Sequence, residues 1–261
     1  MTFWKISSLT ESVRRAFSEA ADQYDILAGL HREIGRELMG KIVRLPLARH
    51  ILDVGCGTGY LTGKTKFYFP ESHVIGLDVS DQMLVKAQEK HENISWIAAD
   101  AHRLPLKDKA MDIIVSNLAY QWVLDLSKAF AEARRVLSPE GVLAATLFGY
   151  HTCDELFSSL QAVGVVPRDF HRLPTMDDVQ RSLAQAGFAK TDVDYERIQI
   201  QFKDLWDLLG WLKAIGANGL SNGGFLGSEA LEEANKYCLK TYPYHDGIRI
   251  TFEVIWIYGN V

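Results

Sequence analysis

The pattern of apolar and polar residues changes near residue 46. Before it, apolar side chains recur at steps of three and four residues, as at Val13, Phe17 and Ala20, which predicts helices across residues 10–45. After it, short apolar runs alternate with helical stretches. The runs predict strands at 50–54, 73–78, 94–99, 111–116 and 142–147, with helices at 60–68, 81–91 and 125–137.

Strands that alternate with helices predict an α/β fold with a parallel sheet covered on both faces. Towards the C-terminus, two helices are expected at 154–163 and 176–186, and alternating segments at 188–202 and 248–258 predict two more strands. The expected parts are an N-terminal helical segment (1–45), a core (46–202), a helical insertion (203–245) and a last core strand (246–261).

Composition and charge exclude several classes of protein. The chain has 261 residues with 28 Lys+Arg against 33 Asp+Glu, a net charge of −5, so it lacks the positive field that attracts nucleic acid. Its three cysteines form no CxxC pair, which argues against a disulfide framework or a zinc site, and we expect no metal. No apolar run has the ~18 residues of a membrane span, so we expect a cytoplasmic protein without membrane contact.

The first strand leads into the loop Asp53-Val54-Gly55-Cys56-Gly57-Thr58-Gly59, whose glycines allow a tight turn and a close approach to a ligand. A dinucleotide site would have GxGxxG, but Tyr60 stands at the third glycine position. S-adenosylmethionine (SAM) carries no phosphate and has a cationic end. The acid Asp53 suits its ammonium group, directly or through water, and would repel a pyrophosphate.

Two more carboxylates follow strands at suitable spacings. Asp78 lies 78 − 55 = 23 residues after Gly55, where an acid accepts the two ribose hydroxyls; as a helix N-cap, Ser80 is the better candidate. Asp100 follows the third strand and can accept the adenine amino group, and Met83 can pack on the adenine face. Each residue alone also fits a turn, a solvated loop or the core, but the combination favours a SAM site.

These residues resemble the class I SAM-dependent methyltransferases, as do the segments 116–122 and 133–141. The runs 17–25, 117–122 and 212–218 are further similar to the malonyl-acyl-carrier-protein O-methyltransferases of biotin synthesis. The resemblance implies a Rossmann-like, seven-stranded, mostly parallel sheet with an antiparallel last strand. It implies a cofactor site made of Asp53, Gly55, Cys56, Gly57, Gly59, Asp78, Val79, Met83, Asp100, Ala101, Asn117 and Leu118.

The resemblance also implies methyl transfer from SAM to the free carboxylate of a malonyl thioester, leaving S-adenosylhomocysteine. A carboxylic acid has a reference pKa near ~4 and is already ionised, so no general base is needed and we nominate none of the eight histidines. Aromatic side chains would keep the acceptor pocket dry, and a cation, Arg249 or Lys213, would hold the acceptor; the aromatics expected there are Tyr24, Tyr120, Trp122, Trp206 and Trp211. The residues expected at the reacting groups are Tyr24, Gln121, Trp122 and Arg249.

The expected partner is an acyl-carrier protein bearing malonyl, or malonyl-coenzyme A. Carrier proteins are acidic, and residues 1–50 hold eight Lys/Arg against six Asp/Glu, so a docking surface is expected partly there, around Arg14 and Arg15. The glycines of 210–224 make lid motion of the insertion conceivable. Alternatives left open are methylation of a quinone precursor or another free acid, and a non-catalytic SAM-binding protein; Tyr60 disfavours a nicotinamide oxidoreductase.

Overall fold

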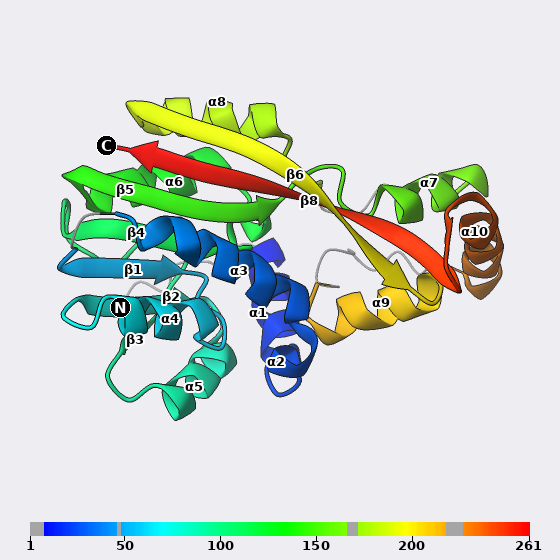
Figure 1. The fold of residues 1–261 in the computed structure, drawn as a ribbon, viewed down its shortest axis with the longest axis horizontal. Helices are drawn as coiled ribbons and strands as arrows, with labels where there is room; N and C mark the ends of the chain where they lie inside the picture. The colour runs from blue at the N-terminus through cyan, green and yellow to red at the C-terminus, as the bar shows by residue number, and fades with distance from the viewer. Residues whose placement is uncertain (1–7, 46–47, 166–171, 218–226) are drawn as a thin grey trace.

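A computed structural model describes residues 8–45, 48–165, 172–217 and 227–261. One twisted sheet has the strand order β3-β2-β1-β4-β5-β8-β6, and all strands on this path are parallel except β8 (Figure 1). The fold class expected from the sequence is thereby confirmed, including the antiparallel last strand. The strands are β1 (His50–Val54), β2 (His73–Asp78), β3 (Ser95–Ala98), β4 (Met111–Asn117), β5 (Leu137–Phe148), β6 (Lys190–Phe202) and β8 (Gly247–Asn260).

The sheet differs from the expected seven strands by one short addition. β7 (Pro243–Tyr244) pairs with the start of β8, with Tyr244 opposite Gly247. It gave no sequence signal because two residues are too few to set up an alternating pattern. β7 and the start of β8 form a tight hairpin, which lies far from the glycine loop.

The continuous apolar runs of the central strands have a simple cause, which is that each strand serves two cores. In β1, Ile51 packs in the cluster under α3 (Gly29–Ile42) and α4 (Tyr60–Tyr68). The next residue, Leu52, packs in the cluster under α6 (Leu126–Val136) and α8 (Met176–Ala186). Since neighbouring residues face opposite sides of a strand, both must be apolar. α5 (Asp81–Lys90) follows β2.

The segment before the sheet forms α1 (Ser8–Ala20), α2 (Tyr24–Leu27) and α3, and α1 contacts α5. Beyond the parallel strands, β6 and β8 run on as a long antiparallel pair, from Lys190 opposite Asn260 to Phe202 opposite Ile248. Around the far end of this pair lie α7 (Asp154–Ala162), α9 (Leu205–Ala214) and α10 (Ser228–Thr241) (Figure 1). Asn218, the last residue of the run 212–218, and three of the five glycines behind the lid expectation (219, 223 and 224) lie outside the described residues.

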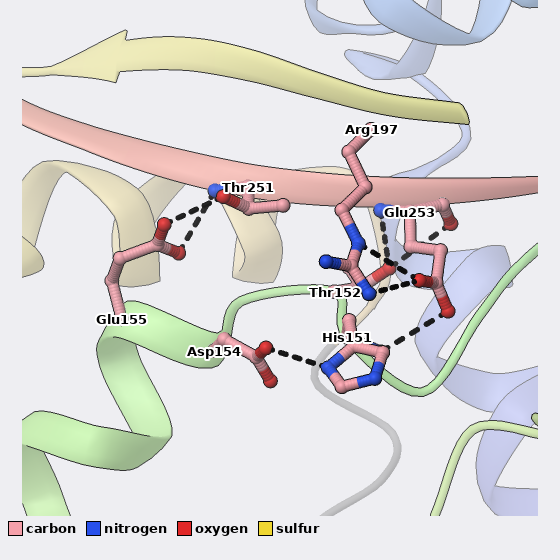
Figure 2. A network of polar contacts seen from close by, with 7 residues as sticks. All are labelled: His151, Thr152, Asp154, Glu155, Arg197, Thr251 and Glu253. Carbon is pink, nitrogen blue, oxygen red and sulfur yellow. Dashed lines mark hydrogen bonds and ion pairs between the residues drawn. The ribbon is translucent and has the colours of Figure 1, made fainter.

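Two buried carboxylates fix the turn that leads from β5 to α7 (Figure 2). Glu253 of β8 accepts a hydrogen bond from Arg197 Nε at 3.0 Å, and its backbone exchanges hydrogen bonds with the Thr152 hydroxyl. Glu155, at the start of α7, accepts from both the backbone N–H (2.9 Å) and the hydroxyl (2.6 Å) of Thr251. The chain leaving the end of β5 is therefore held against β8.

We expect Glu155→Ala to lower the free energy of unfolding by about 2–4 kcal/mol, because it leaves two buried polar groups of Thr251 without partners. The matched control is Asp154→Ala, whose half-exposed carboxylate bonds His151 (2.8 Å) and should contribute less than about 1 kcal/mol. Urea denaturation followed by circular dichroism measures both. Equal losses in the two variants would contradict this account of the turn.

Candidate cofactor and acceptor site

The loop between β1 and α4 has a backbone that only glycine adopts easily. Gly55 and Gly57 both have positive φ, +72° and +52°. A Cβ on Gly55 would also lie 2.2 Å from the Cβ of Ala119, so the segment after β4 packs directly against the loop. The N–H groups of Gly55 and Cys56 donate to the carbonyl oxygen of Leu77 in β2. The loop is thus fixed between the ends of β1, β2 and β4.

Asp53, the last acid before the glycines, is 1% exposed. Its Oδ2 accepts a 2.6 Å hydrogen bond from the Thr62 hydroxyl of α4, whereas its buried Oδ1 has no hydrogen-bond partner among the described residues. Burial raises the pKa of Asp53 to about 7, against the hydrogen bond from Thr62, and the charge of Asp78 adds to the rise. A cationic group is the ligand that this oxygen lacks.

Asp78 ends β2 with both carboxylate oxygens oriented by the backbone. Oδ2 accepts from the N–H of Gly57 at 2.9 Å, and Oδ1 accepts from the N–H of Ser80 at 2.8 Å. Ser80 is the N-cap of α5, as the sequence indicated, and its hydroxyl accepts from the Met83 N–H. Burial raises the pKa of Asp78, although these backbone donors oppose the rise. Each oxygen keeps a lone pair for a hydroxyl donor.

Asp100 is held by a residue that the sequence did not single out. Its Oδ1 accepts from the backbone N–H (2.8 Å) and from Nδ1 (2.6 Å) of His102. Partial burial alone would raise the pKa of Asp100, but these two hydrogen bonds bring it below its usual value. The carboxylate is therefore ionised and fixed in position at neutral pH, as an acceptor for an amino group must be.

These carboxylates border two neighbouring hollows. The cofactor cavity, about 790 Å³ with its open mouth, is lined by Asp78, Asp100 and the expected apolar contacts. The loop cavity, about 440 Å³, is lined by Asp53 and the glycine loop. Nine of the predicted cofactor residues line the cofactor cavity: Gly55, Gly57, Asp78, Val79, Met83, Asp100, Ala101, Asn117 and Leu118. Five line the loop cavity: Asp53, Cys56 and, again, Gly55, Gly57 and Asn117.

Gly59 lines neither cavity. It precedes α4 with φ +84°, and a Cβ there would lie 2.9 Å from the Trp96 ring, so its requirement for glycine comes from the turn and from packing. Cys56 lines the loop cavity, where burial raises the pKa of its thiol and keeps it protonated.

The segment after β4 separates the two cavities. Asn117 donates from Nδ2 to the carbonyl oxygen of His31 (2.9 Å) and accepts from the Thr146 hydroxyl (2.9 Å), so it joins α3 to the sheet. Leu118 has φ +54°, which is uncommon for leucine, and its N–H donates to the Thr146 carbonyl oxygen. This backbone shape lets one short segment line both cavities.

Two of the four residues expected at the reacting groups reach the cofactor cavity, Tyr24 and Trp122. Burial, with the nearby Asp78 charge, raises the pKa of Tyr24, so its phenol stays neutral. Trp122 packs edge-on against Phe17 of α1, with ring centroids 5.4 Å apart. Tyr120 also lines this cavity, but Trp206 is 44% exposed and does not.

The other two expected residues lie elsewhere. Gln121 is buried, donates to the Leu118 carbonyl oxygen at 2.8 Å and lines a side cavity with Arg172 instead. Arg249 is exposed and lines none of the three cavities described. Its neighbours Ile248 and Ile250 point into the core, so strand alternation turns Arg249 to the opposite face.

The sequence analysis did not predict several contacts that complete the site. Asp25 of α2 accepts from the Thr58 hydroxyl (2.6 Å) and pairs with Lys90 of α5, and so the N-terminal segment is attached to the glycine loop. Arg32 lines the loop cavity beside Asp53. Motif spacing along the chain cannot reveal partners that lie on different elements. Among the described residues, no cluster of three potential metal ligands occurs, and no helix has the length and apolar character to cross a bilayer.

Comparison with known proteins gives concordant matches. Residues 52–145 match the family described as "Methyltransferase domain". The chain is 32% identical to the malonyl-[acyl-carrier protein] O-methyltransferase of Methylovorus sp., covering 94% of this chain and 86% of the relative. It is 33% identical to the enzyme of the same name from Geobacter sulfurreducens, covering 95% and 97%. The fold resembles Haemonchus contortus phosphoethanolamine N-methyltransferase 2 bound to S-adenosylhomocysteine (TM-score 0.62, 17% identity, covering 98% and 61%).

The fold, the glycine loop and the three oriented carboxylates define a SAM-dependent methyltransferase. The buried, unpartnered oxygen of Asp53 fits the cationic end of that cofactor. The matches above extend over nearly the whole chain, well past the cofactor core. The chain belongs to the malonyl-[acyl-carrier protein] O-methyltransferase family.

We expect SAM affinity to rise with pH through about 7 and to decline again above about 8, where the ammonium group of SAM loses its proton. Below its pKa of about 7, Asp53 is protonated and cannot pair with an ammonium group, so affinity should fall by up to about tenfold per pH unit. Calorimetric titrations between pH 6 and 8.5 measure this dependence.

The Asp53→Asn variant should bind SAM at least about tenfold more weakly at pH 8 and should lose most of the pH dependence. Asp177→Asn, an exposed site on α8, is the control and should behave as the unmodified protein. A full pH slope in Asp53→Asn would assign the titration to another group.

Proposed function

We propose that this enzyme transfers the methyl group of SAM to the free carboxylate of a malonyl thioester on an acyl-carrier protein, the first ester of the pimeloyl chain of biotin. The observation that carries the proposal is the match to malonyl-[acyl-carrier protein] O-methyltransferases along 94–95% of the chain, which includes the N-terminal helices and the insertion. Of those parts, the N-terminal helices contribute Phe17 and Tyr24 to the cofactor cavity, whereas the core between residues 52 and 145 matches a methyltransferase domain in general.

The described residues form a complete set for holding the cofactor. Asp53 would pair with the ammonium group, and Arg32, in the same cavity, with the carboxylate of the amino-acid end. Asp78 would accept the ribose hydroxyls, and Asp100 the adenine amino group, with Met83 and Ala101 against the base. Val79, Asn117 and Leu118 would pack around the nucleoside. When bound, SAM supplies a methyl group on a positively charged sulfur.

The protein's contribution to the reaction is alignment and exclusion of water. The acceptor carboxylate is ionised at neutral pH, so no side chain has to remove a proton. Opposite charges on the reactants disappear as the methyl group moves, so a pocket of low polarity favours the reaction. Tyr24, with its neutral phenol, and Trp122 contribute such a lining at the mouth of the cofactor cavity, and they would hold the acceptor in line.

An assay with SAM and malonyl-acyl-carrier protein tests this function directly. We expect mass spectrometry to show the gain of one methyl group on the malonyl carrier. An acetyl carrier is the matched control, since it lacks the free carboxylate and should gain none. Parallel reactions with malonyl-coenzyme A establish which thioester is preferred. Tight SAM binding without methyl transfer to either malonyl thioester would contradict the proposal.

The carrier protein is acidic, so its docking should depend on exposed cations near the cofactor cavity. On α1, which contributes Val13 and Phe17 to that cavity, Arg14 pairs with Glu11 (2.6 Å), but exposed Arg15 forms no ion pair among the described residues. We expect Arg15→Glu to raise the KM for malonyl-acyl-carrier protein by about three- to tenfold at low salt, with little effect at 0.5 M salt.

Lys190→Glu is the control, because Lys190 begins β6 at the edge of the sheet opposite the glycine loop. Its KM should change little at either salt concentration. A salt-independent change in Arg15→Glu, or equal changes in the two variants, would remove α1 from the docking surface.

A further inference from the structure

His31 of α3 lies between the glycine loop and Trp211 of the insertion. It lines the loop cavity together with Asp53. Its ring contacts three aromatic rings from three different elements, with centroid distances of 5.8 Å to Tyr24, 5.9 Å to Phe148 and 6.3 Å to Trp211. Phe148 ends β5 and Trp211 belongs to α9, so His31 joins this cavity to the end of β5 and to the insertion.

The imidazole has an unused polar atom. Nδ1 of His31 is buried and has no hydrogen-bond partner among the described residues. Buried polar atoms nearly always have such a partner, because leaving one unpaired costs about 1–3 kcal/mol. The indole N–H of Trp211 is already bonded to the Leu27 carbonyl oxygen, and the loop cavity, which His31 lines, is the space from which a ligand can supply a partner.

His31 is also neutral at physiological pH. Burial, with the charge of Arg32 as a smaller cause, lowers the pKa of His31 to about 4. A neutral ring is suited to hold a carboxylate that must react as a nucleophile. A cation would bind the carboxylate more tightly but would also withdraw its charge, whereas a neutral N–H orients one oxygen and leaves the other reactive.

We propose that His31 binds the acceptor, with Nδ1–H donating a hydrogen bond to the oxygen of the malonyl carboxylate that does not attack the methyl group. This inference rests on the proposed function and adds a substrate-binding residue to it. The amino-acid end of the cofactor has Asp53 and Arg32 in the same cavity for its two charges, so it leaves the neutral histidine available. His31 takes up no proton in the reaction.

Kinetics of two variants test the role. We expect His31→Leu, which keeps the volume and removes the donor, to lower kcat/KM for malonyl-acyl-carrier protein by about ten- to a hundredfold. His31→Gln restores a neutral N–H and should recover to within about tenfold of the unmodified enzyme. The SAM dissociation constant, measured by calorimetry, should change less than about twofold in both. His73→Leu, an exposed histidine at the start of β2, is the control and should leave every parameter unchanged.

A second measurement uses the unmodified enzyme and does not depend on how the variants fold. With ¹⁵N-labelled histidine and saturating S-adenosylhomocysteine, adding malonyl-pantetheine should shift the Nδ1 resonance of His31, and adding acetyl-pantetheine should not. A shift caused by S-adenosylhomocysteine alone, with weaker SAM binding in His31→Leu, would make His31 a cofactor residue and overturn the proposal. Unchanged resonance and unchanged kinetics would overturn it too.

The experiments distinguish a failure of the role proposed for His31 from a failure of the proposed substrate. Methyl transfer to malonyl-acyl-carrier protein by the unmodified enzyme, together with full activity of His31→Leu, would remove only the role of His31. Absence of transfer by the unmodified enzyme would remove the proposed substrate itself.

Discussion

The site depends on one buried charge at the end of the first strand. Asp53 keeps one carboxylate oxygen bonded to Thr62 and the other unpaired beside the loop cavity. Ionising a buried carboxylate has a high desolvation cost, which a cation beside it offsets. The folded protein therefore favours a cationic ligand at this position. The glycine loop follows at once, and its backbone shape brings that ligand against the strand ends.

The parallel sheet explains how the remaining groups meet the same ligand. β1, β2, β3 and β4 end at one edge, and the residues that follow them carry the polar groups of the site. Asp78 is oriented by the loop itself through the Gly57 N–H, and Asp100 is held by His102. The loop thus positions Asp78, whereas Asp53 is fixed by Thr62 of α4 and Asp100 by His102.

The sequence located the strands and the residues at their ends because these signals are local. Apolar runs identified the strands, and fixed spacings after them located Asp53, Asp78 and Asp100. The proposed acceptor side was harder to predict, because the rings around His31 come from α2, β5 and α9 and meet only in the fold. Arg249 illustrates the limit: its charge suited a carboxylate, but the register of β8 turns it away from the cavities described. His31 carried no motif, and its burial and unpaired nitrogen are visible only in three dimensions.

The two sides of the site differ in how they use charge, and the chemistry requires this difference. The cofactor carries positive charge, and the carboxylates at the strand ends border the two cavities proposed for it. The acceptor must keep its charge available for attack, so the groups that face it should be neutral. Tyr24 and His31 satisfy this condition, because burial raises the pKa of one and lowers that of the other. The same desolvation therefore keeps two titratable side chains uncharged on the side where we propose that the acceptor binds.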